Sequence, residues 1–386
     1  MNHSQGKAYE ELAKIYNEKE TAVKRWESNN QKIIGCIGYD VPIEILMAAG
    51  YFPVQITGDS KIKTPVADKY LEIAFDASVR AQFEKIVSGK YSYLDRIVIS
   101  NSSDVLIRLY YYMRQMRRVE EELLPIPLYF FDIKFSQFRS STLYNRERVQ
   151  EFIEAVQCWT GKAILPDAME NAFNVCNENR KLLKQMQELR IADEPKVTGT
   201  EALTVIGASL YMPKEEHNKL MKKFLDEAQS AQTVKGTRIY VSGTAHEDTG
   251  FYELLEGCGV HIVGEDHDLG SRLFMGPEVS PAYPVESVTD FYQTRFPSIK
   301  KSHVRERVAA VVEQVKNTGA KGAIYFIRKS DDAASWDYPS LRKGLEAINV
   351  PVLLLDKQNY NLDNKEELQN KISEFITSIS NQPGRE

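Results

Sequence analysis

The sequence lacks the features of membrane, disulfide-stabilised and nucleic-acid-binding proteins. No apolar run approaches the roughly 20 residues needed to span a bilayer, and the opening stretch "MNHSQGKAYEELAKIYNEKE" has no signal-peptide core. The chain has four cysteines, Cys36, Cys158, Cys176 and Cys258. They are far apart and form no Cys-x-x-Cys pair, which argues against a disulfide framework or a zinc site. The net charge of −5 argues against general nucleic-acid binding. We therefore expect a cytoplasmic protein with reduced thiols.

The composition is that of an ordinary globular protein. Hydrophobic residues make up 42% of the chain and charged residues 27%, with no tract that would suggest disorder. A chain of 386 residues is long enough for two or three domains, each with its own core.

Strand-loop-helix-strand units occur in both halves of the sequence. The stretch "KIIGCIGYDVPIEILMAAGYFPVQI" predicts a strand, a polar loop, a helix that begins after Pro42 and ends at Gly50, and a second strand. The same plan returns in "TRIYVSGTAHEDTGFYELLEGCGVHIVGED". Likewise, "RIVISNSSDVLIRLYYYM" followed by "IPLYFF" resembles "GAIYFIRKSDDAASWDYPSLRKGLEAINVPVLLLD". Parallel strands need crossover helices, so each half predicts a parallel sheet.

We expect an α/β protein with two similar Rossmann- or flavodoxin-like parallel-sheet domains and an intervening helical segment. In that segment Val149, Phe152, Ile153 and Val156 recur at helical spacing. The predicted parts are an N-terminal α/β domain with a leading helix over residues 1–145, a helical segment over 146–234, and a C-terminal α/β domain over 235–386.

Polar loops after the strands are the expected functional positions, because the carboxyl ends of parallel strands open into a crevice. Ser102, Ser103 and Asp104 follow one such strand. Ser102 and Asp104 have a structural alternative, since both residue types cap helices. His246 with Glu247 follows another strand and suits acid-base chemistry, although a solvated loop explains the pair equally well.

Five motifs in order resemble the family of 2-hydroxyacyl-CoA dehydratase and benzoyl-CoA reductase subunits. They are "GYDVPIEILMAAGYFPVQITGD", "LDRIVISNSSD", "NENRKLLKQMQELR", "GEDHDLGSR" and "WDYPSLRKGLEAINVPVLLLD", and the resemblance extends over about residues 8–378. It implies a subunit that pairs with a related subunit. The family typically carries iron–sulfur clusters and receives electrons from an ATP-hydrolysing activator to reduce a CoA thioester.

The chain departs from this family at the cysteines that the resemblance implies as cluster ligands. Asp76 in "FDASVRA", Ser103 in "SNSSD" and Asp331 in "RKSDDAASWD" stand at those positions, and a further cysteine of some members corresponds to Gly38. We therefore expect no cluster and no metal site in this chain, and an iron–sulfur cluster only in the partner. Alternatively, Asp76, Ser103 and Asp331 form a site for a hard cation such as magnesium or calcium.

The resemblance and the strand-end loops together give two sets of candidate residues. The candidate catalytic residues are Ser103, Asp331, His246 and Asp76. The candidate substrate-binding residues are Gly38, Tyr39, Glu44, Ser102, Asp104 and Arg272. For Gly38, Tyr39 and Glu44 a packing role is about as well supported, and for Arg272 the expected partner is a CoA phosphate or the partner subunit.

Three functions remain open on the sequence. The leading hypothesis is a cluster-free subunit that shapes the CoA-thioester cavity beside an iron–sulfur paralogue and helps to dock the activator. The second is a cluster-independent acyl-CoA hydratase or lyase that uses Asp76, Asp331 or His246. The third is a purely structural partner subunit.

Overall fold

Two parallel sheets form the framework of this computed structural model, which describes residues 6–27, 31–72, 74–329 and 331–381. The N-terminal sheet contains β1 (Ile33–Ile37), β2 (Phe52–Gln55), β3 (Arg96–Ser100) and β4 (Leu128–Phe131). The C-terminal sheet contains β5 (Thr237–Gly243), β6 (Val260–Glu265), β7 (Gly322–Arg328) and β8 (Val352–Gln358). The strand orders, β2-β1-β3-β4 and β6-β5-β7-β8, are equivalent, and every pairing is parallel. The predicted fold class is confirmed.

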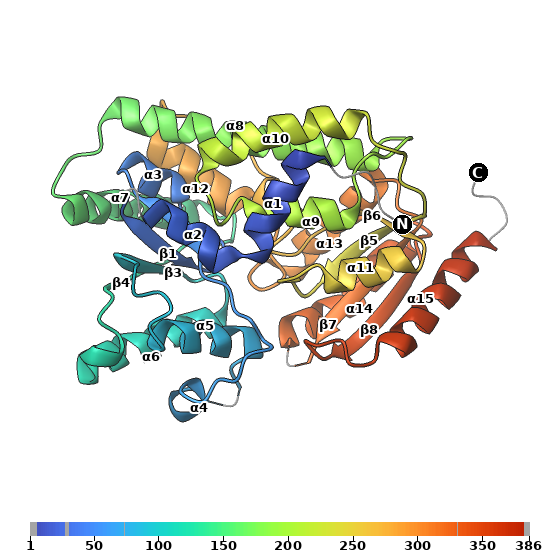
Figure 1. Cartoon of the computed structure of the whole chain (residues 1–386), viewed down its shortest axis with the longest axis horizontal. Coiled ribbons are helices and arrows are strands. Elements are labelled where there is room, and N and C mark those ends of the chain that lie inside the picture. The colour runs from blue at the N-terminus through green and yellow to red at the C-terminus, as the bar shows by residue number, and fades with distance from the viewer. Residues whose placement is uncertain (1–5, 28–30, 73, 330, 382–386) are drawn as a thin grey trace.

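Helices connect the strands in both halves (Figure 1). In the first half they are α1 (Lys7–Asn17), α2 (Lys19–Glu27), α3 (Ile43–Ala48), α4 (Ala67–Tyr70), α5 (Ala77–Val87), α6 (Asp104–Val119) and the 3₁₀ turn η1 (Glu121–Leu123). The middle contains α7 (Arg139–Thr160), α8 (Pro166–Ile191), α9 (Gly199–Ala208) and α10 (Lys214–Gln229). The second half adds α11 (Gly250–Gly257), η2 (Ser271–Leu273), α12 (Pro284–Thr294), α13 (Val304–Asn317), α14 (Asp332–Glu346) and α15 (Lys365–Ser380).

Each sheet is buried on both faces, as strands with continuous apolar runs require. In β3, Ile97 and Ile99 face a core shared with α5 and α6, whereas Val98 faces the core formed with α3 and α7. In β7, Ile324 faces the α11 and α15 side, and Tyr325 faces the α13 and α14 side. The period of two along each strand thus divides its side chains between two helical layers.

The helical segment joins the two halves. Helix α8 contacts α3 in the first half and β6 in the second, and Figure 1 shows it running along one side of the molecule beside α10. Helix α12 comes from the C-terminal part of the chain, but Val288 and Phe291 pack in the core of the N-terminal sheet with Phe152. The division at residues 145 and 234 remains a prediction, and α12 crosses it in space.

The carboxyl ends of the two sheets face one another. The loops after β1 and β3 and the loops after β5, β6, β7 and β8 all contribute to one shared cavity. A crevice of this kind is the usual ligand position in open parallel sheets. Within the described residues, no helix combines the length and apolar character that crossing a bilayer would require.

Candidate active-site cavity between the two sheets

The cavity between the sheets has a volume of about 120 Å³. Six of the ten candidate residues line it: Gly38, Tyr39, Asp76, Ser102, Ser103 and Asp331. Thr244, Glu247, Asp268, Lys300 and Tyr360 are among the other lining residues. Residues from both halves, far apart in sequence, therefore share one site.

The turn after β1 depends on a glycine. Gly38 has φ +83°, a left-handed conformation that strains other residues, and a Cβ there would collide with the hydroxyls of Ser100 and Ser102. Those hydroxyls lie 2.7 Å apart, and Ser102 Oγ accepts a hydrogen bond of 3.0 Å from the backbone N–H of Tyr39. Ser102 therefore holds the turn that carries Tyr39 into the cavity.

The three positions at which the resemblance implies cysteines are all helix N-caps. Asp76 Oδ1 accepts from Val79 N at 2.9 Å and caps α5. Ser103 Oγ accepts from Leu106 N at 3.3 Å and caps α6. Asp331 Oδ1 accepts from Ala334 N at 3.4 Å and caps α14. Three helix N-termini thus meet at one cavity, and their dipoles favour an anion or a carbonyl oxygen there.

Lys300 places an ammonium group among the carboxylates of the cavity. Its Nζ lies 3.0 Å from Asp331 Oδ1, while Asp331 Oδ2 accepts a 2.7 Å hydrogen bond from Thr244. Burial alone would lower the pKa of Lys300, but the carboxylates of Asp331 and Asp76 raise it above its usual value. Burial also raises the pKa of Asp76, and Lys300 opposes that shift. The lysine therefore stays charged beside the carboxylates.

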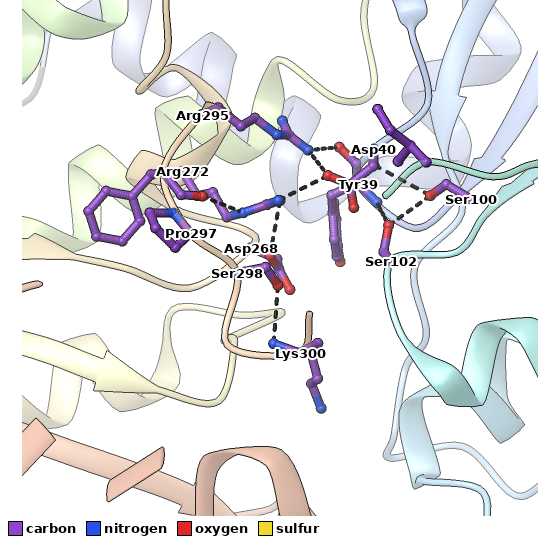
Figure 2. A network of polar contacts seen from close by, with 12 residues as sticks. Tyr39, Asp40, Ser100, Ser102, Asp268, Arg272, Arg295, Pro297, Ser298 and Lys300 are labelled. Atoms are coloured by element: carbon purple, nitrogen blue, oxygen red, sulfur yellow. Dashed lines mark hydrogen bonds and ion pairs between the residues drawn. The ribbon is translucent and has the colours of Figure 1, made fainter. Parts of the chain in front are cut away.

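A buried ion network supports one side of the cavity (Figure 2). Asp40 Oδ1 contacts Arg295 and lies 2.9 Å from Arg272 Nη2, and Arg272 Nη1 lies 3.2 Å from Asp268. Burial alone would raise the pKa of Asp40, but the two guanidinium groups hold it well below its usual range. Because Asp40 belongs to the first half and both arginines to the second, these ion pairs join the halves beside the cavity.

Four candidate residues lie elsewhere. Arg272 is 1% exposed, and its guanidinium faces Asp40 and Asp268 within the chain. Glu44 is buried against Arg180 and Tyr292. The Asp104 side chain is 90% exposed and pairs with Lys301 at 2.7 Å.

The fourth, His246, points away from the cavity that its neighbour Glu247 lines. Its ring stacks on Phe251 at a centroid distance of 4.8 Å and lies equally far from Phe326. Burial holds the pKa of His246 well below its usual value, so the imidazole is neutral. The structure therefore does not bring His246 together with Asp76, Ser103 and Asp331.

The comparisons with known proteins agree with this architecture. The model of the family described as "2-hydroxyglutaryl-CoA dehydratase, D-component" matches residues 39–379. The chain belongs to this family. The match extends over most of both α/β halves and includes five of the six candidate residues that line the cavity, all but Gly38, which directly precedes it. It confirms the resemblance seen in the sequence motifs.

Several relatives of known function align with nearly the whole chain. The beta subunit of (R)-phenyllactyl-CoA dehydratase from Clostridium sporogenes is 25% identical over 369 residues, 95% of this chain and 96% of the relative. The C subunit of benzoyl-CoA reductase from Thauera aromatica is 24% identical over 93% and 94% of the two chains. The beta subunit of (R)-2-hydroxyglutaryl-CoA dehydratase from Acidaminococcus fermentans is 22% identical over 89% and 91%. Each of these relatives is named as a subunit of an enzyme.

The donor atoms around the cavity of this D-component chain do not fit an iron–sulfur cluster. Such clusters are held mainly by cysteine thiolates, whereas Asp76, Ser103 and Asp331 offer oxygen atoms that cap helices, and Asp331 also pairs with Lys300. Of the cysteines, all in described parts of the chain, Cys36 and Cys176 are buried elsewhere, and none lines this cavity. Among the described residues, no three His, Cys, Asp or Glu side chains are grouped to hold a metal ion.

Sequence reasoning missed Lys300 and Asp40 as members of the site. Lys300 lies in "SIKKSH", which has no motif character, so no local signal distinguished it from Lys301. Asp40 lies inside the motif "GYDVPIE", between the candidates Tyr39 and Glu44. Its role depends on Arg272 and Arg295, more than 230 positions away, and only the folded chain brings them together.

Proposed function

We propose that this chain is the cluster-free subunit of a reductive acyl-CoA enzyme of the 2-hydroxyacyl-CoA dehydratase or benzoyl-CoA reductase type. It closes one wall of the CoA-thioester cavity beside an iron–sulfur paralogue in a cytoplasmic hetero-oligomer. The names of its relatives support this assignment, because each is the beta or C subunit of an enzyme that acts on a CoA thioester. An ATP-dependent activator is the expected source of electrons for the complex.

The observation that carries the proposal is that helix-capping residues occupy the three positions at which the resemblance implies cysteines. These residues are Asp76, Ser103 and Asp331. Asp76 and Asp331 are held by backbone N–H groups, and Asp331 also pairs with Lys300. These contacts hold three helix N-termini at a polar cavity without any cluster. Such a cavity suits the carbonyl group of a thioester, with the Lys300 ammonium and the Ser103 hydroxyl as hydrogen-bond donors.

The first experiment is anoxic co-purification of this chain with its related subunit, followed by iron and sulfide analysis of each separated subunit. We expect stoichiometric iron and sulfide in the partner only, and turnover of an acyl-CoA only by the complex. A cluster spectrum from this chain alone that is lost on changing Asp76, Ser103 or Asp331 would contradict the proposal. Turnover by the isolated, iron-free chain would instead favour the acid-base hydratase.

The second experiment tests the wall of the cavity itself. Ser103→Tyr places a large side chain beside Tyr39 and Asp331, so turnover by the assembled complex should fall at least tenfold while the fold persists. Ser378→Tyr, on the exposed side of α15, is the control for the same substitution away from the cavity. Unchanged turnover and acyl-CoA affinity in Ser103→Tyr would favour the purely structural role.

A further inference from the structure

A second and larger cleft opens beside the cavity. It has a volume of about 430 Å³, within the range of about 300–1,000 Å³ typical of ligand sites, and it shares Glu247 and Tyr360 with the smaller cavity. The loop after β2 and the ends of β7 and β8 contribute to it, together with the junction of α1 and α2. Nothing in the proposed function accounts for this cleft.

Arg328 gives the cleft a buried cation without an ion-pair partner among the described residues. It is 5% exposed, its Nη1 donates to the carbonyl of Asn359 at 3.0 Å, and its Nε has no hydrogen-bond partner. The other deeply buried arginines each pair with a carboxylate; they are Arg180, Arg190, Arg272, Arg295 and Arg307. A buried guanidinium that lacks such a partner is costly unless an anion completes it.

Lys19 is a second cation of the cleft with no carboxylate within ion-pair distance among the described residues. Its Nζ donates to the backbone carbonyl of Glu247 at 3.0 Å and lies over the ring of Tyr16 at 4.6 Å. Burial lowers the pKa of Lys19. An anion placed in the cleft would stabilise the charged forms of both Lys19 and Arg328.

Half-buried Glu247 and exposed Asp248, the two acids of the loop after β5 that line the cleft, already have partners. The Glu247 carboxylate accepts a hydrogen bond from Ser78, and Asp248 pairs with Lys61 at 2.9 Å. Burial raises the pKa of the Glu247 carboxyl, so this group attracts the neighbouring cations less strongly than a fully ionised carboxylate would. The lining as a whole has five acidic and four basic side chains, so an anion would be held locally by Arg328 and Lys19 and not by a net positive charge of the cleft.

Aromatic rings line the same cleft, which therefore offers flat apolar faces beside its cations. The tyrosines among its lining residues are Tyr16, Tyr91, Tyr93, Tyr211 and Tyr360. Tyr360 is half-buried, and the Arg328 guanidinium lies over its ring at 4.5 Å. Guanidinium groups bind phosphate in a fork geometry, and aromatic rings stack on nucleobases of any kind.

We infer that this cleft binds an organic phosphate with an aromatic base, such as an adenine nucleotide. Arg328 and Lys19 contact the phosphate, and tyrosine rings lie beside the base. Two sources share this chemistry: the nucleotide end of a CoA thioester whose acyl end reaches the adjoining cavity, and a free nucleotide. The CoA source rests on the proposed function, whereas the phosphate site itself does not.

The test is calorimetric titration of the full-length chain with CoA, ADP and inorganic pyrophosphate at low ionic strength. We expect CoA and ADP to bind with one site per chain and pyrophosphate to bind more weakly. Arg328→Gln should weaken binding of both nucleotides about ten- to hundredfold, because it removes a charge-assisted contact. Arg328→Lys should recover part of the lost affinity, because lysine keeps the positive charge.

Arg342→Gln is the matched control, because it removes the same charge from an exposed position on α14 outside the cleft. It should leave both affinities unchanged, and the thermal midpoints of all variants establish that they are folded. Tighter binding of CoA than of ADP assigns the site to the substrate, and the reverse order assigns it to a free nucleotide.

Absence of CoA and ADP binding at millimolar concentration, or equal affinities in wild type and Arg328→Gln, would overturn the inference. That result is distinct from failure of the proposed function. The complex can turn over acyl-CoA without a phosphate site in this cleft, and this chain can bind a nucleotide without belonging to such a complex.

Discussion

Lys300 and Lys301 are neighbours in sequence with different surroundings. The Lys300 ammonium reaches Asp331, whose side chain is only 5% exposed, whereas Lys301 pairs with Asp104, whose side chain is 90% exposed. Solvent screens the second pair, so its contribution to stability is small. In the first pair, loss of the cation leaves a desolvated carboxylate, and such losses are costly.

We predict that Lys300→Met lowers the free energy of unfolding at pH 7 by about 2–4 kcal/mol. Lys301→Met is the matched control and should cost less than about 1 kcal/mol. Urea unfolding followed by circular dichroism measures both. Equal effects of the two substitutions would mean that the Lys300 pair is as well hydrated as a surface pair.

The N-termini of α5, α6 and α14 have a common construction. Each begins with a residue whose side-chain oxygen accepts the backbone N–H three positions later, so the strand-end loops continue directly into helices. A cysteine is a poor substitute in this role, since sulfur is a weak hydrogen-bond acceptor. Return of a cysteine to one position would therefore remove a cap and supply one thiolate only.

We predict that Asp76→Ala lowers the free energy of unfolding by about 1 kcal/mol, because Val79 N–H loses its acceptor. Asp76→Asn should retain most of that stability, since asparagine caps helices about as well as aspartate. Thermal unfolding monitored by circular dichroism measures the difference. Equal losses in Asp76→Asn and Asp76→Ala would show that the charge beside Lys300, which both variants lack, outweighs the cap.

Several histidines are buried in the neutral form and link the stability of the folded chain to pH. Burial lowers the pKa of His217 to about 3 and those of His261 and His267 to about 4. In the unfolded chain a histidine titrates near 6.5, so between about pH 6.5 and 4 the unfolded state binds more protons than the folded state. Stability must therefore fall as the pH falls through this window.

The buried carboxylate of Glu265 extends the loss of folding stability to lower pH. Burial alone would raise the pKa of Glu265, but Arg190, 2.7 Å away, lowers it to about 2. Stability from this pair is present above the unfolded value near 4.3 and is lost as the pH falls towards 2.

We predict that the free energy of unfolding decreases from pH 7 to pH 5 and that His217→Gln reduces this decrease by roughly 1–2 kcal/mol. His303→Gln, at an exposed position before α13, should leave the decrease unchanged. Urea unfolding at pH 7, 6 and 5 provides the comparison. An identical pH dependence in wild type and His217→Gln would show that His217 has the same pKa in the folded and the unfolded chain.

Local patterns in the sequence determined the two parallel sheets, the helices between the strands and the loops that carry Gly38, Ser103 and Asp331. Strand and helix periods, Pro42 before α3 and Gly50 after it are properties of neighbouring residues, so no distant contact was needed to predict them. The family motifs follow the same local order, and they located six of the ten candidate residues at the cavity.

Only the tertiary structure decided which polar groups meet. The His246 ring lies in an apolar core, and Arg272 pairs with Asp40 across the two halves. Lys300 lies beside the carboxylates of Asp331 and Asp76. Arg328 is buried in a cleft that contains elements from both ends of the chain. These outcomes depend on packing between segments hundreds of residues apart, and desolvation then determines which charges must be paired. The sequence pattern around each residue contains neither its distant partner nor its burial.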